Sequence, residues 1–264
     1  MYLEYWGLKK YPFENVPDPE FMFYSHEHEE ALARLVYAAK RNKGAVLLTG
    51  DIGSGKTTLS RVFIQQLADS EFDIGLINNP CLEPLDFLKE TLYQLGLNPR
   101  SQSKSDFLQM LNNRMIKNWK NNRTTLLIID EAQLIYKETF EEIRLLLNFQ
   151  VNDRYLLTLI LMGQPELRDI IRGYKQLDQR IAIRYNLNSL SRESADKCIA
   201  FRLEKAGQTK SIFSAAALEE CYNYSRGIPR KINNVCDLAL LVGCGMMVET
   251  IDADIIKRVI RDSL

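Results

Sequence analysis

A glycine-rich segment at residues 50–57 constrains this chain of 264 residues more than any other feature. It reads Gly50-Asp51-Ile52-Gly53-Ser54-Gly55-Lys56-Thr57 and follows an apolar run, residues 45–49, that is typical of a buried strand. A helical pattern, residues 57–68, comes directly after it. Glycines let backbone N–H groups wrap around an anion, and a helix N-terminus favours negative charge. The segment therefore predicts a loop that holds the phosphates of a nucleotide.

Within this loop the sequence assigns a role to each type of side chain. The lysine of the pattern reaches the β- and γ-phosphates, and the hydroxyl residue after it ligates Mg²⁺, so these roles fall to Lys56 and Thr57. The residues expected to contact the nucleotide are Gly50, Asp51, Ile52, Gly53, Ser54, Gly55, Lys56, Thr57 and Thr58.

Two carboxylates follow a second buried strand, residues 124–129. Asp130 is expected to hold Mg²⁺ through water, and Glu131 is expected to orient and deprotonate an attacking water. Another strand, residues 156–162, leads to Gln164. Two interpretations of Gln164 remain open, because its amide can hold the lytic water or can cap the helix that begins at Pro165.

Three arginines are further candidates for contacts with phosphate. Arg180 and Arg184 flank the last strand, residues 181–187, where surface charge is an equally good interpretation. Arg230 lies on the first turn of a later helix, and Gly227 and Pro229 fix the direction of the chain before it. An arginine held in this way can bind a phosphate through two hydrogen bonds or pair with an acid.

Short apolar strands alternate with helical patterns over most of the chain, which indicates an α/β fold with a parallel sheet covered on both faces. The remaining strand is expected at residues 73–78, and the helices are expected at residues 84–95, 105–120, 137–150 and 165–172 and from residue 25 onward. After residue 190 only helices are expected, with Ser191, Ser214 and Asp252 as N-caps. We therefore predict a core domain, residues 1–190, that includes an aromatic and proline-rich N-terminal coil, and a helical lid, residues 191–264.

The chain resembles the AAA+ ATPases, and within them the general secretion pathway protein A (ExeA-like) group, over nearly its whole length. The motifs that carry this resemblance are Tyr5-Trp6-Gly7-Leu8 with Pro12-Phe13, Pro17-Asp18-Pro19, Tyr24-Ser25-x-x-His28, Asp130-Glu131-Ala132-Gln133, Gly163-Gln164-Pro165-Glu166-Leu167 and Gly227-Ile228-Pro229-Arg230-x-Ile232-Asn233. The resemblance implies ATP hydrolysis with Mg²⁺ and a sheet order of 5-1-4-3-2. It also implies that Gln164 is the sensor 1 residue, that Arg230 is the sensor 2 residue, and that Arg180 is an arginine finger serving a neighbouring subunit of a homo-oligomer.

Two functions of different classes remain open. The first is an ATPase that drives assembly or remodelling of a cell-envelope machine for type II secretion, type IV pili or polysaccharide export, through a protein partner. The second is a DNA-binding transposition regulator, because ATPases of the TniB and TnsC kind look similar. Segment 100–123 bears on this choice, since it holds six basic residues and one acid in a chain with 34 acidic and 34 basic residues. It can track the phosphates of DNA or, in the interpretation that we favour, form a solvated helix face. A nucleotide switch without turnover is disfavoured by Glu131.

Composition and hydropathy bear on the location of the protein. The longest strongly apolar run, residues 238–248, is too short to span a bilayer, so we expect a cytoplasmic protein without direct membrane insertion, unless a partner takes it to the inner face of the membrane. The larger members of the resembling group carry a transmembrane segment and a peptidoglycan-binding domain after the ATPase. This chain ends at Leu264 with neither, so a direct role at the cell wall is not expected, and two interpretations stay open, a stand-alone short form and an ATPase fragment.

Two expectations concern the N-terminal coil. Residues 13–28 are the candidate for the adenine pocket, because an apolar base needs apolar walls. His26 and His28 are expected at a solvated helix start rather than in a metal site, since nothing suggests a third ligand.

Overall fold

The computed structural model describes residues 2–67, 71–100, 102–152 and 154–263, and the chain forms two compact units. The sheet unit consists of Glu29–Gly50 and Ser60–Leu187. The helical unit consists of the N-terminal residues up to His28, the loop segment Asp51–Leu59, and Asn188–Leu264. The chain therefore passes from the first unit to the second more than once, and the phosphate loop predicted from the sequence, apart from Gly50, belongs to the helical unit. The expected helix end at Ala68 lies outside the described residues.

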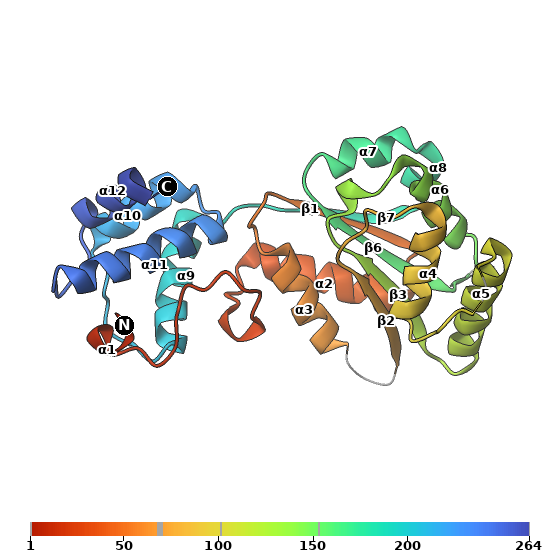
Figure 1. Cartoon of the computed structure of the whole chain (residues 1–264), viewed down its shortest axis with the longest axis horizontal. Coiled ribbons are helices and arrows are strands. Elements are labelled where there is room, and N and C mark those ends of the chain that lie inside the picture. The colour runs from red at the N-terminus through yellow and green to blue at the C-terminus, as the bar shows by residue number, and fades with distance from the viewer. Residues whose placement is uncertain (1, 68–70, 101, 153, 264) are drawn as a thin grey trace. The chain divides into compact units, whose positions relative to one another are not determined.

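A five-stranded parallel sheet forms the centre of the sheet unit, in the order β2-β3-β6-β1-β7 (Figure 1). The strands are β1 (Ala45–Gly50), β2 (Phe72–Ile77), β3 (Thr124–Ile129), β6 (Leu157–Gly163) and β7 (Ile181–Leu187). Counted one to five along the chain and read from β7, this is the order 5-1-4-3-2, so the predicted topology is confirmed. The pairs Thr49–Gly163 and Ile129–Leu161 place the carboxyl ends of β1, β6 and β3 at one edge of the sheet.

Helices cover both faces of this sheet. They are α2 (His26–Arg41), α3 (Lys56–Gln66), α4 (Pro84–Gln94), α5 (Lys104–Lys120), α6 (Lys137–Leu146), α7 (Leu167–Gly173) and α8 (Lys175–Asp178), with a short 3-10 helix η2 (Ala132–Leu134). On one face, Phe87, Phe107 and Phe140 from α4, α5 and α6 are fully buried against Leu127 and Leu159. The alternate strand residues Val46, Ile128 and Ile160 are buried as well, as a sheet covered on both faces requires.

One expected helix is shorter than its pattern suggested. The prediction for residues 137–150 is wrong at its end, because α6 stops at Leu146 and Gln150–Val151 (β4) pairs antiparallel with Arg154–Tyr155 (β5). Asn152 adopts a φ of 47°, in the left-handed region that asparagine tolerates better than most residues. A local turn signal therefore outweighed the helical periodicity.

The helical unit is built from α1 (Tyr2–Trp6), the 3-10 helix η1 (Pro19–Phe21), α9 (Arg192–Lys205), α10 (Ala215–Ser225), α11 (Pro229–Gly245) and α12 (Ala253–Ser263). The predicted N-caps are confirmed. The side chains of Ser191, Ser214 and Asp252 accept hydrogen bonds from the backbone N–H groups of Ser194, Ala217 and Ile255.

The N-terminal segment packs with these helices. The indole N–H of Trp6 donates to the carbonyl of Leu240 at 2.9 Å, and the Phe13 ring meets the Phe213 ring edge-on at 6.2 Å. Phe21 is buried in the same apolar cluster. The coil that we expected within the core domain therefore groups with the helical unit, while the predicted domain boundary at residue 190 stays a prediction.

Candidate nucleotide site

The phosphate loop has the backbone conformation that its glycines predict. Gly53 and Gly55 have φ values of +82° and +100°, which side chains rarely tolerate. The amide of Leu59 donates to the carbonyl of Gly55 at 2.8 Å, so helical hydrogen bonding starts inside the loop. Lys56 is the first residue of α3, is buried, and its Nζ donates to the carbonyl of Asp51 at 3.0 Å. The side chain of Lys56 thus closes the loop by a hydrogen bond to its first half.

His28 braces this loop from the N-terminal segment, a role that the sequence analysis missed. Its Nε2 lies 3.2 Å from the carbonyl oxygen of Ser54, and its Nδ1 lies 2.7 Å from Oγ of Ser25. A carbonyl only accepts, so Nε2 carries the hydrogen and, in the neutral ring, Nδ1 accepts from the Ser25 hydroxyl. Burial lowers the pKa of His28, and the bond to Ser54 opposes this only in part. The expected solvated position is therefore wrong for His28, although it holds for His26, which is exposed.

Arg230 lies against the same loop. Its backbone N–H donates to the carbonyl of Gly53 at 3.3 Å, and a Cβ on Gly53 would lie 2.6 Å from the Cβ of Arg230. Gly227 fixes this turn, because its φ is +76° and a Cβ there would come within 2.0 Å of the carbonyl oxygen of Leu190. The exposed side chain of Arg230 therefore starts beside the loop, and its position on the first turn of α11 is the one that the sequence predicted.

The two predicted carboxylates lie at the carboxyl end of β3. Asp130 is buried, its amide donates to the carbonyl of Ile77 at 2.9 Å, and its Oδ1 accepts from the amide of Glu131 at 2.9 Å. Glu131 has left-handed dihedral angles, φ 51° and ψ 38°. The backbone therefore turns sharply at Glu131, which is the kind of uncommon conformation found at functional positions.

Gln133 connects Glu131 to the end of β6, a role that we did not predict from the sequence. Its Nε2 donates to Oε2 of Glu131 at 2.6 Å, and its Oε1 accepts from the backbone N–H of Gln164 at 3.1 Å. The only signal was its place in the Asp130-Glu131-Ala132-Gln133 motif. The capping interpretation of Gln164 finds no support, since α7 begins at Leu167 with Glu166 in the N-cap position.

The two arginines near β7 differ in their contacts. Arg184 forms an ion pair with Asp178 at 2.6 Å and also donates to the carbonyl of Asp178. Arg180 donates to the neutral side chain of Asn148, and its Nη1 has no hydrogen-bond partner among the described residues. Arg180 is thus the less committed of the two cations.

These residues have the chemistry that a nucleotide and Mg²⁺ require. Thr57 and Asp130 supply oxygen atoms, the ligands that Mg²⁺ prefers. The loop supplies backbone N–H groups and a helix N-terminus for phosphate. The hydroxyl of Ser54 is buried in the loop without a hydrogen-bond partner within the part of the chain that the structure describes, so it has unused capacity for a ligand.

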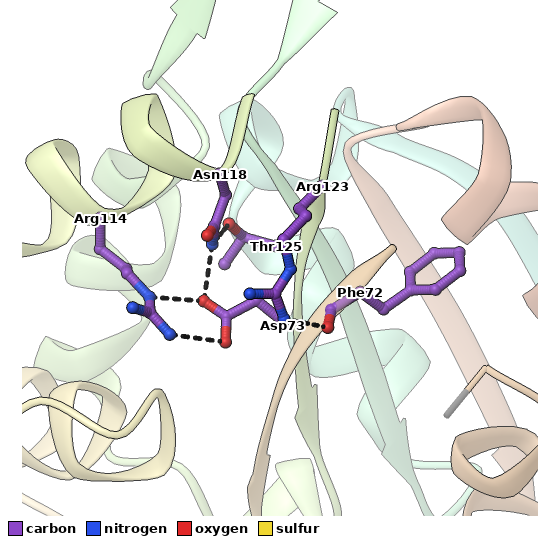
Figure 2. A network of polar contacts seen from close by, with 6 residues as sticks. All are labelled: Phe72, Asp73, Arg114, Asn118, Arg123 and Thr125. Carbon is purple, nitrogen blue, oxygen red and sulfur yellow. Dashed lines mark hydrogen bonds and ion pairs between the residues drawn. The ribbon is translucent and has the colours of Figure 1, made fainter. Parts of the chain in front are cut away.

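The basic segment 100–123 is partly consumed by internal contacts, as Figure 2 shows. Arg114 binds both carboxylate oxygens of Asp73, at 2.7 and 3.1 Å, and Arg123 donates to the carbonyl of Phe72 at 2.8 Å. Lys104 pairs with Glu142. Half of the six basic residues are thus engaged within the sheet unit. Fewer positive charges remain for binding DNA phosphates, which weakens the interpretation of this segment as a DNA-binding surface.

Comparison with known proteins decides the family. The family model described as "AAA domain" matches residues 39–171, half of the chain. This chain belongs to the AAA domain family. The AAA domain assignment agrees with the sheet order and with the phosphate loop, and the protein has the fold of the AAA+ P-loop ATPases.

A curated relative is also similar. General secretion pathway protein A of Aeromonas hydrophila is 38% identical over 245 residues, which cover 91% of this chain and 44% of that protein. The AAA domain protein described here thus spans less than half the length of that relative. Its resemblance to the general secretion pathway protein A group is confirmed by this match.

Solved structures share the fold at low sequence identity. ORC1 of Aeropyrum pernix, in complex with DNA, has a TM-score of 0.71 at 13% identity and covers 96% of this chain and 69% of its own. Cdc6p of Pyrobaculum aerophilum has a TM-score of 0.68 at 16% identity, with coverages of 89% and 68%. RuvB of Thermotoga maritima, a Holliday junction branch migration motor, has a TM-score of 0.58 at 19% identity, with coverages of 90% and 69%. At these identities the likeness shows the fold alone.

Among the described residues, none of the helices combines the length and the apolar character needed to cross a membrane.

Proposed function

We propose that this AAA domain protein binds ATP with Mg²⁺ and hydrolyses it to ADP and phosphate. The observation that carries the proposal is the phosphate loop, with two left-handed glycines and Lys56 at the start of α3. An anion held there meets backbone N–H groups, the positive end of a helix and an ammonium group together. The residues from Gly50 to Thr58 are the nucleotide contacts that we propose.

The side chains divide the chemical work. Lys56 and Arg230 offset the negative charge of the phosphates, and Thr57 and Asp130 hold the metal ion. Mg²⁺, when bound, neutralises charge that develops on the transferred phosphoryl group. Glu131 accepts the proton of the attacking water, and Gln164 holds that water beside the γ-phosphate.

The cellular role that we propose is inferred from the similarity to general secretion pathway protein A. General secretion pathway protein A is named for secretion, and we infer that this chain couples ATP turnover to assembly or remodelling of a cell-envelope machine. Turnover then takes place in a cytoplasmic homo-oligomer, and a protein partner holds it at the inner face of the membrane. Likeness to one relative of more than twice this length supports the proposal.

A DNA-binding transposition regulator of the TniB and TnsC kind is the second candidate. Arg100, Lys117 and Lys120 are the basic residues of segment 100–123 whose side chains form neither an ion pair nor a hydrogen bond among the described residues, and all three are exposed. If this candidate is right, DNA binding in the presence of ATP will fall steeply with salt, and Lys117→Ala with Lys120→Ala will reduce the salt dependence. If the protein does not bind DNA at physiological salt, the second candidate is excluded and the role in a cell-envelope machine remains.

Steady-state ATPase assays with two pairs of variants test the proposed reaction. Lys56→Ala should abolish nucleotide binding or turnover, while Lys120→Ala, an exposed lysine on α5, should retain both. Glu131→Gln should bind ATP and turn over at least about 100-fold more slowly, because the amide keeps the shape but removes the base. Glu138→Gln, the same change at an exposed position of α6, is its control. Normal turnover in Lys56→Ala overturns the assignment, and normal turnover in Glu131→Gln overturns the role of that residue.

A further inference from the structure

Gln133 is held at both ends of its amide group. The residue lies in η2, directly after the sharp turn at Glu131, and its side chain is half-buried. One end of the amide donates to the Glu131 carboxylate at 2.6 Å, and the other accepts from the Gln164 backbone at 3.1 Å. A single side chain therefore joins the proposed catalytic base to Gln164, the residue that directly follows the neighbouring strand β6.

The partners fix the direction of this amide. A carboxylate can only accept and a backbone N–H can only donate, so the nitrogen of Gln133 must face Glu131 and its oxygen must face Gln164. The bond to Glu131 has a charged acceptor, which makes it shorter and stronger than a bond between neutral groups. The link thus needs a donor at one end and an acceptor at the other. An aspartate or glutamate at this position has only acceptors and does not reproduce it.

Gly163 leaves room for the link. A Cβ at this position would lie 2.4 Å from Oε1 of Gln133 and 2.8 Å from a methyl group of Leu167. Gly163 does not have the positive φ that would require glycine for backbone reasons. The glycine at the end of β6 is therefore needed for space, and the largest part of that space is taken by the Gln133 amide.

We propose that Gln133 is the positioning residue for Glu131, and that it couples the carboxyl end of β6 to the orientation of the base. A displacement of Gln164, the residue proposed to hold the attacking water, moves the oxygen of Gln133 and with it the carboxylate of Glu131. The amide group of Gln133 in this way holds the attacking water and the base Glu131 in a fixed position relative to each other. The inference rests on the proposed function, because it takes Glu131 to be the base.

A double-mutant cycle tests the coupling. We would measure kcat for ATP, and Kd for a fluorescent ATP analogue, in the wild type, Gln133→Ala, Glu131→Gln and the double variant. Gln133→Ala should lower kcat by about 10- to 100-fold and change Kd by less than about twofold, because misplacing a catalytic group by about 1 Å costs that much in rate. In the Glu131→Gln background the same change should lower kcat by less than about twofold, since the group on which Gln133 acts is already lost.

Two further variants keep the test independent of folding defects. Gln94→Ala removes a glutamine that donates to Glu90 at 2.8 Å on the exposed side of α4, and it should leave kcat unchanged. Gln133→Glu keeps the size of the side chain and an acceptor for Gln164 but cannot donate to Glu131, so it should lower kcat at least as far as Gln133→Ala.

The outcomes separate this inference from the proposed function. Normal turnover in Glu131→Gln would show that Glu131 is not the base, and it would overturn both the proposed role of Glu131 and the positioning role of Gln133. Slow turnover in Glu131→Gln with normal or increased kcat in Gln133→Ala or Gln133→Glu overturns the positioning role alone. Fold-changes that multiply in the double variant overturn it as well, because a residue that only stabilises the fold acts independently of Glu131.

Discussion

At the scale of single residues, the phosphate loop is stabilised by contacts that no motif describes. Lys56 donates to the carbonyl of Asp51, His28 donates to the carbonyl of Ser54, and the amide of Arg230 donates to the carbonyl of Gly53. Each of these bonds satisfies a carbonyl oxygen of the loop. With its carbonyls engaged, the loop can keep its N–H groups turned toward a phosphate, and this is why we regard His28 as part of the candidate site.

The buried His28 predicts a pH dependence of stability. Its pKa is lowered in the folded protein, chiefly by burial, so between the folded pKa and about 6.5 the unfolded chain binds more protons than the folded one. The contribution is therefore complete above about pH 6.5 and is lost as the pH falls toward the folded pKa. Glu27 is the charged group that acts on His28, and it opposes the shift only weakly. Urea unfolding between pH 7.5 and 5.5 should show a loss of unfolding free energy that is smaller in His28→Gln.

His26→Gln is the matched control for this measurement. The same substitution is made two residues earlier, at an exposed imidazole, and it should keep the pH dependence of the wild type. If His28→Gln and His26→Gln lose unfolding free energy equally as the pH falls, the buried imidazole does not account for the effect.

At the scale of elements, α5 is fastened to the sheet by the polar network in Figure 2. Asn118 is buried and donates to Oδ2 of Asp73 at 2.6 Å and to Oγ1 of Thr125 at 2.8 Å. Together with Arg114 it joins α5 to β2 and β3 near the start of both strands. Burial alone would raise the pKa of Asp73, but the hydrogen bonds from Arg114 and Asn118 outweigh it and hold that pKa below its usual value.

Removing Arg114 should cost more stability than the charge of a surface residue would suggest. Arg114→Ala leaves the carboxylate of Asp73 buried without its cation, which should lower the unfolding free energy by about 3 kcal/mol. Lys117→Ala, an exposed lysine on the same helix, should change it by less than about 0.5 kcal/mol. Arg114→Lys should be intermediate, because lysine cannot bind both carboxylate oxygens in the same way. Chemical denaturation of the three variants gives these values.

The pH dependence of the Arg114 effect has a definite sign. The lowered pKa of Asp73 contributes stability that is present above about pH 4 and is lost as the pH falls through the folded pKa. The difference between wild type and Arg114→Ala should therefore shrink below about pH 4. A difference that stays constant down to pH 3 would show that the charge of Asp73 is not what Arg114 stabilises.

Elements and motif positions could be predicted from the sequence because their signals are local. Strand β3 and strand β7 have the predicted bounds, and the caps at Ser191 and Ser214 were recognised from one residue each. His28, Gln133 and Asp73 could not be predicted, because their partners lie 26, 31 and 41 residues away. Sequence periodicity carries no information on such contacts, and they depend on how the strands and helices meet.

At the scale of the whole molecule, the question is whether one chain suffices for catalysis. The cations that we propose for the nucleotide, Lys56 and Arg230, come from the same chain as the loop. Charge that develops on the γ-phosphate calls for a further cation if hydrolysis is to be fast. Arg180 is our candidate, by its resemblance to the arginine finger that serves a neighbouring subunit. In the single chain it donates to Asn148, a neutral partner that it can exchange for phosphate at low cost.

Assembly should therefore control turnover. Specific ATPase activity should rise with protein concentration, and a non-hydrolysable ATP analogue should produce a larger species in sedimentation or light scattering. Arg180→Ala should bind nucleotide as the wild type does and hydrolyse it at least about 100-fold more slowly, because arginine fingers contribute on the order of 10³ or more to phosphoryl transfer. Arg172→Ala, an exposed arginine of α7 that pairs with Asp169, is the control and should stay active.

Mixing two inactive variants distinguishes a finger in trans from an arginine that acts within its own chain. In a mixture of Arg180→Ala with Glu131→Gln, some interfaces pair an intact Glu131 from one subunit with an intact Arg180 from the next. Activity should therefore return to part of the wild-type level, whereas an arginine that serves its own site leaves the mixture as inactive as its components. If Arg180→Ala is fully active at every concentration, the neighbour does not supply this cation. Arg184 then becomes the next candidate, and its ion pair with Asp178 would have to break before it reached a phosphate.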